Sequence, residues 1–237
     1  MRIPVPESVE RALDAALDKA LAIQRPAVIA YFDRIRQRQP HATPHDVVDQ
    51  LERRYLTAVI GAGAASGGAA ALPGVGIGAS IATGAAEIAA FVSTTAMYVL
   101  ALAEVHGVPV GDPQMRRALV LTVLLGDVGA AAVAGSEIEA KQLAYVLGRS
   151  TAKDTIKTIN GRLAQLLVAR FGARQGALLA GRALPFGIGA SIGAAGNAAL
   201  GRHVINAARR AFGPAPARFP GRIVDVDPTP PRRRELE

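Results

Sequence analysis

The sequence contains no cysteine and no tryptophan, and aromatic residues make up only 4% of its 237 residues. The absence of cysteine excludes a disulfide framework and a thiolate metal site, and it fits a reducing cytosol. Because 50% of the residues are hydrophobic but few carry rings, small aliphatic side chains must fill the core. At this length we expect one domain.

Recognisable catalytic and metal-binding motifs are also missing. There is no H-E-x-x-H, no paired cysteine and no G-x-S-x-G elbow, and the glycine-rich turns lack the Lys-Ser/Thr of a phosphate loop. His41, His45 and Asp49 are spaced four apart, but Pro44 marks a helix start that leaves His41 outside it, so a surface turn is expected. We name no catalytic residue, metal or cofactor, and favour a non-enzymatic protein without excluding an enzyme.

The N-terminal segment MRIPVPESVERALD turns polar at once, where a signal peptide would enter an apolar region. We therefore expect a cytoplasmic protein. Residues 1–140 carry 11 basic and 14 acidic residues, whereas residues 141–237 carry 16 and 5, so the net charges are −3 and +11. A basic C-terminal part suggests a phospholipid surface or nucleic acid as partner, with a solvated basic face as the alternative. No nucleic-acid-binding motif accompanies the arginines, so nucleic acid is not expected.

One motif occurs twice. LPGVGIGASI spans residues 72–81 and LPFGIGASI spans residues 184–192, and their shared GIGASI segments lie 111 residues apart. Each occurrence predicts a tight turn that opens a small-residue helix. The residues of these turns are Pro73, Gly74 and Gly76, then Pro185 and Gly187. Two pseudo-repeated Gly/Ala-rich hairpins, packed closely in one domain, are therefore predicted.

Apolar periodicity and capping signals predict an all-α bundle of about eight helices. Thr43-Pro44-His45-Asp46 reads as a capping start for a helix that runs towards Ile60, and Asp112-Pro113 starts another. We divide the chain into N-terminal amphipathic helices (1–42), a helical domain (43–213) and a flexible Pro/Arg-rich tail (214–237). The other expected helices cover residues 8–23, 26–39, 76–105, 137–147, 152–171, a short segment to 183, and a last helix that ends near 212.

Residues 58–86 contain no charge, and 19 of these 29 residues are Gly or Ala. Length permits a membrane span, but Gly and Ala gain little from lipid, and Pro73 divides the stretch. The more hydrophobic residues 88–103 number only 16 before Glu104. We expect a hairpin buried in a soluble or peripheral protein, with membrane insertion as the alternative.

Polar residues inside these apolar helices are the candidate site. Glu87 needs a partner if it is ionised, either a structural arginine or a ligand. Asp127, near an expected helix end, needs such a partner too if it is buried. Asn160 and Asn197 most simply hydrogen-bond across helices. Basic residues interleaved with leucines predict cationic amphipathic helices suited to an anionic membrane, although a solvated helix face has the same pattern. The arginines proposed to contact lipid are Arg162, Arg170, Arg174 and Arg182.

Over residues 50–213 the sequence resembles the EcsC family of bacterial proteins. The resemblance rests on LPGVGIGASI, GAAEIA, KTINGRLAQLL and the last helix, RALPFGIGASIGAAGNAALGRHVINAARRAF. Glu87, the pair Ile159-Asn160, the turn at Leu184-Pro185 and Asn197 fall on the family's motif positions, with glutamate at 87 where the family usually has aspartate. The family is named for its neighbourhood with an ABC transporter operon.

The resemblance implies membrane-linked biology and no particular reaction. The sequence therefore predicts a peripheral protein at the inner face of the cell membrane that binds anionic lipid or an apolar ligand. Its alternatives are an interaction partner of a membrane transporter and an enzyme that acts on lipid-like substrates through Glu87 or Asp127. No oligomeric state follows from the sequence.

Overall fold

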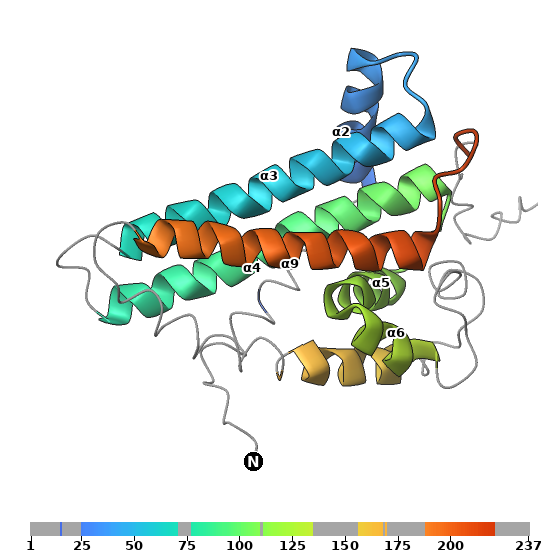
Figure 1. Ribbon diagram of the computed structural model, residues 1–237. Coiled ribbons are helices and arrows are strands. Elements are labelled where there is room, and N and C mark those ends of the chain that lie inside the picture. Colours follow the sequence, from blue (N-terminus) through green and yellow to red (C-terminus); the bar gives the residue numbers. More distant parts are fainter. Residues whose placement is uncertain are drawn as a thin grey trace, which may run out of the picture.

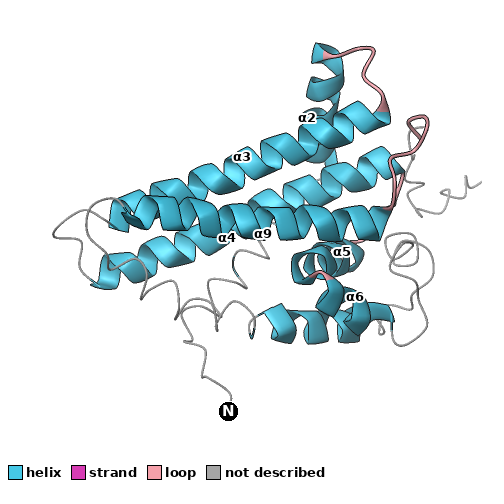
Figure 2. Ribbon diagram, viewed as in Figure 1, coloured by secondary structure: helices cyan, strands magenta, loops and turns pink. Residues whose placement is uncertain are grey.

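The computed structural model describes residues 25–70, 77–109, 111–134, 156–167 and 188–220, together with positions 15 and 169. Within these ranges every regular element is a helix and no strand occurs (Figure 2). The predicted all-α class is therefore confirmed. The helices expected at 8–23, at 137–147 and up to 183 lie outside the described residues, as do the turn residues Pro73, Gly74, Gly76, Pro185 and Gly187.

Three long helices form the centre of the fold (Figure 1). They are α3 (Pro44–Ala70), α4 (Ile77–His106) and α9 (Ile188–Phe212). Helix α3 packs along both of the others and runs antiparallel to them, so the end of α3 and the starts of α4 and α9 share one end of the bundle. Segments far apart in the sequence thus lie side by side.

Shorter helices flank this centre. Helix α2 (Arg25–Arg38) lies across one side and contacts α4. On the other side, α5 (Pro113–Leu125) contacts α4 and α9, and α6 (Asp127–Ala134) packs on α5. A further helical segment, 156–167, lies beside them (Figure 1).

Side-chain caps begin two of these helices where the sequence predicts them. Thr43 and Asp46 bond reciprocally at the start of α3, with the Thr43 Oγ1 donating to Asp46 Oδ2 at 2.7 Å. Asp112 Oδ1 accepts from the backbone nitrogens of Gln114 and Met115 at the start of α5. Both predicted starts are confirmed. They satisfy amide groups that have no partner inside the helix.

The predicted end of α3 is wrong. The sequence predicts a helix that runs towards Ile60, whereas the structure extends it to Ala70 through the Gly/Ala-rich segment. Glycine is a poor helix former in isolation, but packing against α4 and α9 offsets that preference.

Small residues bring α3 and α9 close together. Gly201 of α9 faces α3, and a Cβ placed there would lie 2.9 Å from Leu56 Cδ1 and 3.6 Å from Val59 Cγ1. Around this contact the core is aliphatic, with Leu51 and Val99 almost completely buried. The close approach follows from the scarcity of large side chains.

After α9 the chain turns at Gly213, whose φ is +74°. The described chain then continues to residue 220 without a further helix. Phe219 packs against the core, and Pro220 lies against Gly107. Of the tail predicted to be flexible, residues 214–237, the structure describes residues 214–220, and its Phe219 and Pro220 contact the folded domain. The flexibility of the tail stays a prediction. Residues 221–237 lie outside the described part.

Candidate functional site

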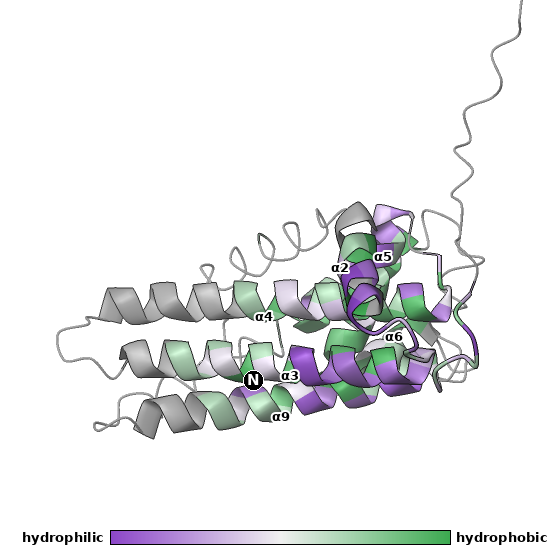
Figure 3. Ribbon diagram, turned by 90° about the horizontal axis from the view of Figure 1, so that it is seen from above, coloured by the Kyte–Doolittle hydropathy of each residue, from purple (hydrophilic) through white to green (hydrophobic). Residues whose placement is uncertain are grey.

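Charge is distributed unevenly along the three long helices. On α3 the last charged residue is Arg54, and on α9 the first is Arg202. Each uncharged segment, 55–70 on α3 and 188–201 on α9, is roughly 20 Å long at the helical rise. Figure 3 shows the hydrophilic residues of α3 and α9 gathered in the half of the bundle that α2 flanks.

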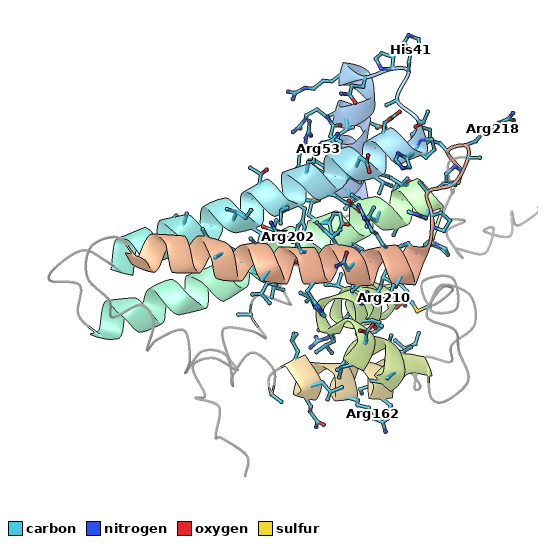
Figure 4. The ribbon with its side chains drawn as sticks, in the orientation of Figure 1. His41, Arg53, Arg162, Arg202, Arg210 and Arg218 are labelled. Carbon is cyan, nitrogen blue, oxygen red and sulfur yellow. The ribbon has the colours of Figure 1, made fainter. Side chains whose placement is uncertain are left out.

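Two contacts show that these segments are in register. Gly201 lies against Leu56 and Val59, and Asn197 Nδ2 donates to the Val59 carbonyl at 3.1 Å. The arginines that bound the segments therefore lie at a similar level, and Figure 4 shows Arg53 and Arg202 about midway along the bundle. We call residues 55–70, 77–86 and 188–201 the uncharged end.

Glu87 lies on α4 beside the uncharged end. Tyr55 ties α3 to α4, because its hydroxyl is 2.9 Å from Thr95 Oγ1 and its ring stacks on Tyr98 at a centroid distance of 4.6 Å. From Thr95 the backbone of Glu87 is about 12 Å nearer the uncharged end at the helical rise. The Glu87 side chain lies outside what the structure describes, so its proposed role stays a prediction.

In the half of the bundle that carries the charged residues, Glu52 of α3 and Arg209 of α9 form an ion pair with two hydrogen bonds. Arg209 Nε donates to Glu52 Oε1 at 2.7 Å, and its Nη2 donates to Oε2. The Glu52 side chain is only 9% exposed, so the guanidinium supplies the partner that a buried carboxylate requires. Burial raises the pKa of the nearby Tyr98 hydroxyl, which stays neutral. Sequence reasoning missed this pair, because its members are 157 residues apart.

The two candidate asparagines bridge helices, as the sequence suggests. Asn197 links α9 to α3, as described above, and Asn160 Nδ2 donates to both the carbonyl and Oε1 of Gln114 at 3.0 Å. Asn160 thus fixes segment 156–167 to the start of α5. This cross-helix role is confirmed, whereas a ligand role for either residue stays a prediction.

Asp127 is not a buried carboxylate. It is the first residue of α6, its side chain is 80% exposed, and its Oδ1 accepts from Arg210 Nη2 at 3.0 Å. Gly126 ends α5 with a φ of +62°, which breaks the apolar helix just before Asp127. Since Arg210 lies near the end of α9 and Glu87 near the start of the parallel α4, the structure does not bring the two carboxylates together.

The basic candidates are only partly described. Arg162 is exposed on segment 156–167 (Figure 4), and Arg170, Arg174 and Arg182 lie outside the described residues. Among the predicted surface-turn residues, His45 Nδ1 is 3.8 Å from Asp49 Oδ2 and His41 precedes α3. No group of three metal-ligating side chains occurs within the described ranges.

By length and composition one described segment could cross a membrane: Ala89–His106, with a mean hydropathy of 1.3. Because 67% of this segment is buried inside the bundle, the core helix of a soluble protein explains it equally well. Comparisons with family models, curated proteins and solved structures find no match. The resemblance to the EcsC family stays a prediction.

Proposed function

We propose that this chain is a non-enzymatic, EcsC-like protein that associates peripherally with the inner face of the cell membrane. The observation that supports this proposal is the uncharged end bounded by Arg53, Arg54 and Arg202. In the proposed orientation this end enters the boundary between headgroups and acyl chains, and the arginines lie level with anionic headgroups.

The expected interaction is shallow and electrostatically assisted. Interfacial segments bury about 5–10 Å into the headgroup boundary, and each basic residue near an anionic surface contributes on the order of 1 kcal/mol. Gly and Ala add little apolar transfer energy. Glu87 limits the depth on α4, since only the first ~15 Å of that helix precede it.

Flotation with neutral and anionic liposomes, at low and high salt, tests the headgroup contact. We expect salt-sensitive binding to anionic vesicles alone. Reversing Arg53 and Arg202 together (R53E/R202E) should weaken binding at least tenfold, since each reversal replaces attraction with repulsion.

The control is Arg218→Glu, which changes the charge of an exposed arginine in the 213–220 segment, away from the uncharged end (Figure 4). Equal loss in this variant would mean that net charge drives binding. No recruitment to either vesicle would refute the proposal and favour a protein partner such as a transporter.

The absence of tryptophan offers a direct test of insertion. A tryptophan at Ile77, the first residue of α4, should show a blue-shifted emission and quenching by brominated lipid acyl chains when anionic vesicles are added. The matched control is Val128→Trp, placed at an exposed apolar residue of α6. Quenching at 128 but not at 77 would show that the opposite face contacts lipid.

A further inference from the structure

A pocket of about 410 Å³ opens between α2, α3 and α4. Tyr31 of α2 forms one wall and Arg54 of α3 another. The α4 wall includes Ser93, Thr94 and Met97. The volume lies in the lower part of the range of about 300–1,000 Å³ that is typical of small-molecule sites.

The pocket has an apolar, aromatic lining. Tyr98 also lines it, and this ring stacks on Tyr55 with an interplanar angle of 14°. Met97 is a flexible thioether side chain that adapts to irregular apolar ligands. Such a lining suits a hydrocarbon chain, while the partly exposed hydroxyl side chains Ser93 and Thr94 supply polar edges.

Arg54 is the charged side chain among the described residues that line the pocket. Arg54 lines it, is partly exposed and forms no ion pair within the described residues. Among the described residues no carboxylate lines the pocket, and the neighbouring Glu52 is already bound by Arg209. A guanidinium beside an apolar cavity selects a carboxylate or phosphate group and disfavours a cation.

We propose that this pocket binds a single-chain amphiphilic carboxylate of the medium-chain fatty acid class. The carboxylate contacts Arg54, and the hydrocarbon chain lies against Tyr31, Met97 and Tyr98. The volume suits one hydrocarbon chain better than the two chains of a diacyl lipid, and the free acid is the ligand that we propose. The pocket shares Arg54, Tyr55 and Ala58 with the end of the bundle proposed to meet the membrane, so its test is made without vesicles.

Calorimetric titration of the full chain, without vesicles, tests the proposal. The probes are decanoate and decyltrimethylammonium, each below its micelle concentration, and decanol below its solubility limit. We expect decanoate to bind at least tenfold more tightly than decanol, the contribution of one charge-assisted contact, and the cation not to bind. Equal affinity for decanoate and decanol would overturn the role of Arg54.

Variants separate this pocket from other surfaces. Arg54→Gln should weaken decanoate binding about tenfold and leave decanol unchanged. Arg38→Gln, at an exposed arginine that does not line the pocket, should change neither. Ala58→Phe places a ring at the pocket wall and should abolish binding of both probes, with the circular dichroism spectrum and thermal midpoint showing that it is folded.

Loss of decanoate binding in Arg38→Gln, or retained binding in a folded Ala58→Phe, would refute the site. Failure of the liposome assay with intact decanoate binding would refute only the membrane proposal. Liposome binding without decanoate binding would refute only the pocket proposal.

Discussion

Two glycines of this fold have opposite surroundings. Gly126 ends α5 with a φ of +62° and a ψ of −132°, a combination that other residues rarely adopt, and a Cβ there would lie 2.6 Å from His203 Nε2. Gly161 lies inside a helical segment, and a Cβ there would meet no atom within 4 Å. Position 126 requires glycine because of its backbone conformation and the lack of space. At position 161 glycine only weakens the helix, because its helix propensity is low.

We expect Gly126→Ala to lower the free energy of unfolding by about 1–2 kcal/mol, because it adds strain and displaces His203. Gly161→Ala should raise it by about 0.5–1 kcal/mol. Urea denaturation of both variants measures the difference. Destabilisation by both would contradict the open space at Gly161.

The two ion pairs of α9 also differ at the residue scale. Arg209 holds the buried Glu52, while Arg210 holds an Asp127 side chain that is 80% exposed. Arg209→Ala leaves a carboxylate buried without its partner and should cost about 2 kcal/mol, a value between those of exposed and buried pairs, because Arg209 itself is largely exposed. Arg210→Ala should cost less than about 0.5 kcal/mol. Equal effects in thermal or chemical denaturation would show that Glu52 gains water or another partner.

At the scale of elements, the contact between α4 and α9 contains a buried histidine. His106 ends α4, its Nδ1 is 2.9 Å from the Leu102 carbonyl oxygen, and its ring centroid is 5.1 Å from that of Phe212. Burial lowers the pKa of His106 below its ordinary value of 6.5. Protonation of this imidazole therefore opposes the packing of the two helix ends.

The sign of the pH effect follows from that shift. The unfolded chain takes up a proton on His106 at a higher pH than the folded chain does. The contribution of neutral His106 to the free energy of unfolding is therefore complete above about pH 6.5, and it is lost as the pH falls through the lowered pKa. We expect the free energy of unfolding to fall between pH 7.5 and pH 5.5, and His106→Gln to reduce this dependence. An unchanged slope in His106→Gln would assign the effect to other groups.

At the scale of the whole molecule, local signals in the sequence predicted local structure well. The caps at Thr43 and Asp112 and the end of α9 near Phe212 were all predicted, because each depends on neighbouring residues. The continuation of α3 to Ala70 could not be predicted, because packing by distant helices determines it.

The candidate site divides in the same way. The sequence indicated an uncharged region, and the bridging role of Asn197 followed from its place on an apolar helix. The Glu52–Arg209 pair and the pocket beside Arg54 combine residues from different helices, so no spacing in the sequence points to them. Asp127 is exposed because the turn at Gly126 ends α5 immediately before it.

The contact between Asn197 and Val59 joins residues 138 positions apart, and this separation governs how the protein folds. During synthesis α3 emerges long before α9, so the α3 surface that α9 covers stays exposed to water while the intervening chain is made. Closing so large a loop is entropically costly and slows the final docking step. A nascent chain that stops short of α9 therefore leaves Leu56 and Val59 of α3 without the helix that covers them in the complete protein.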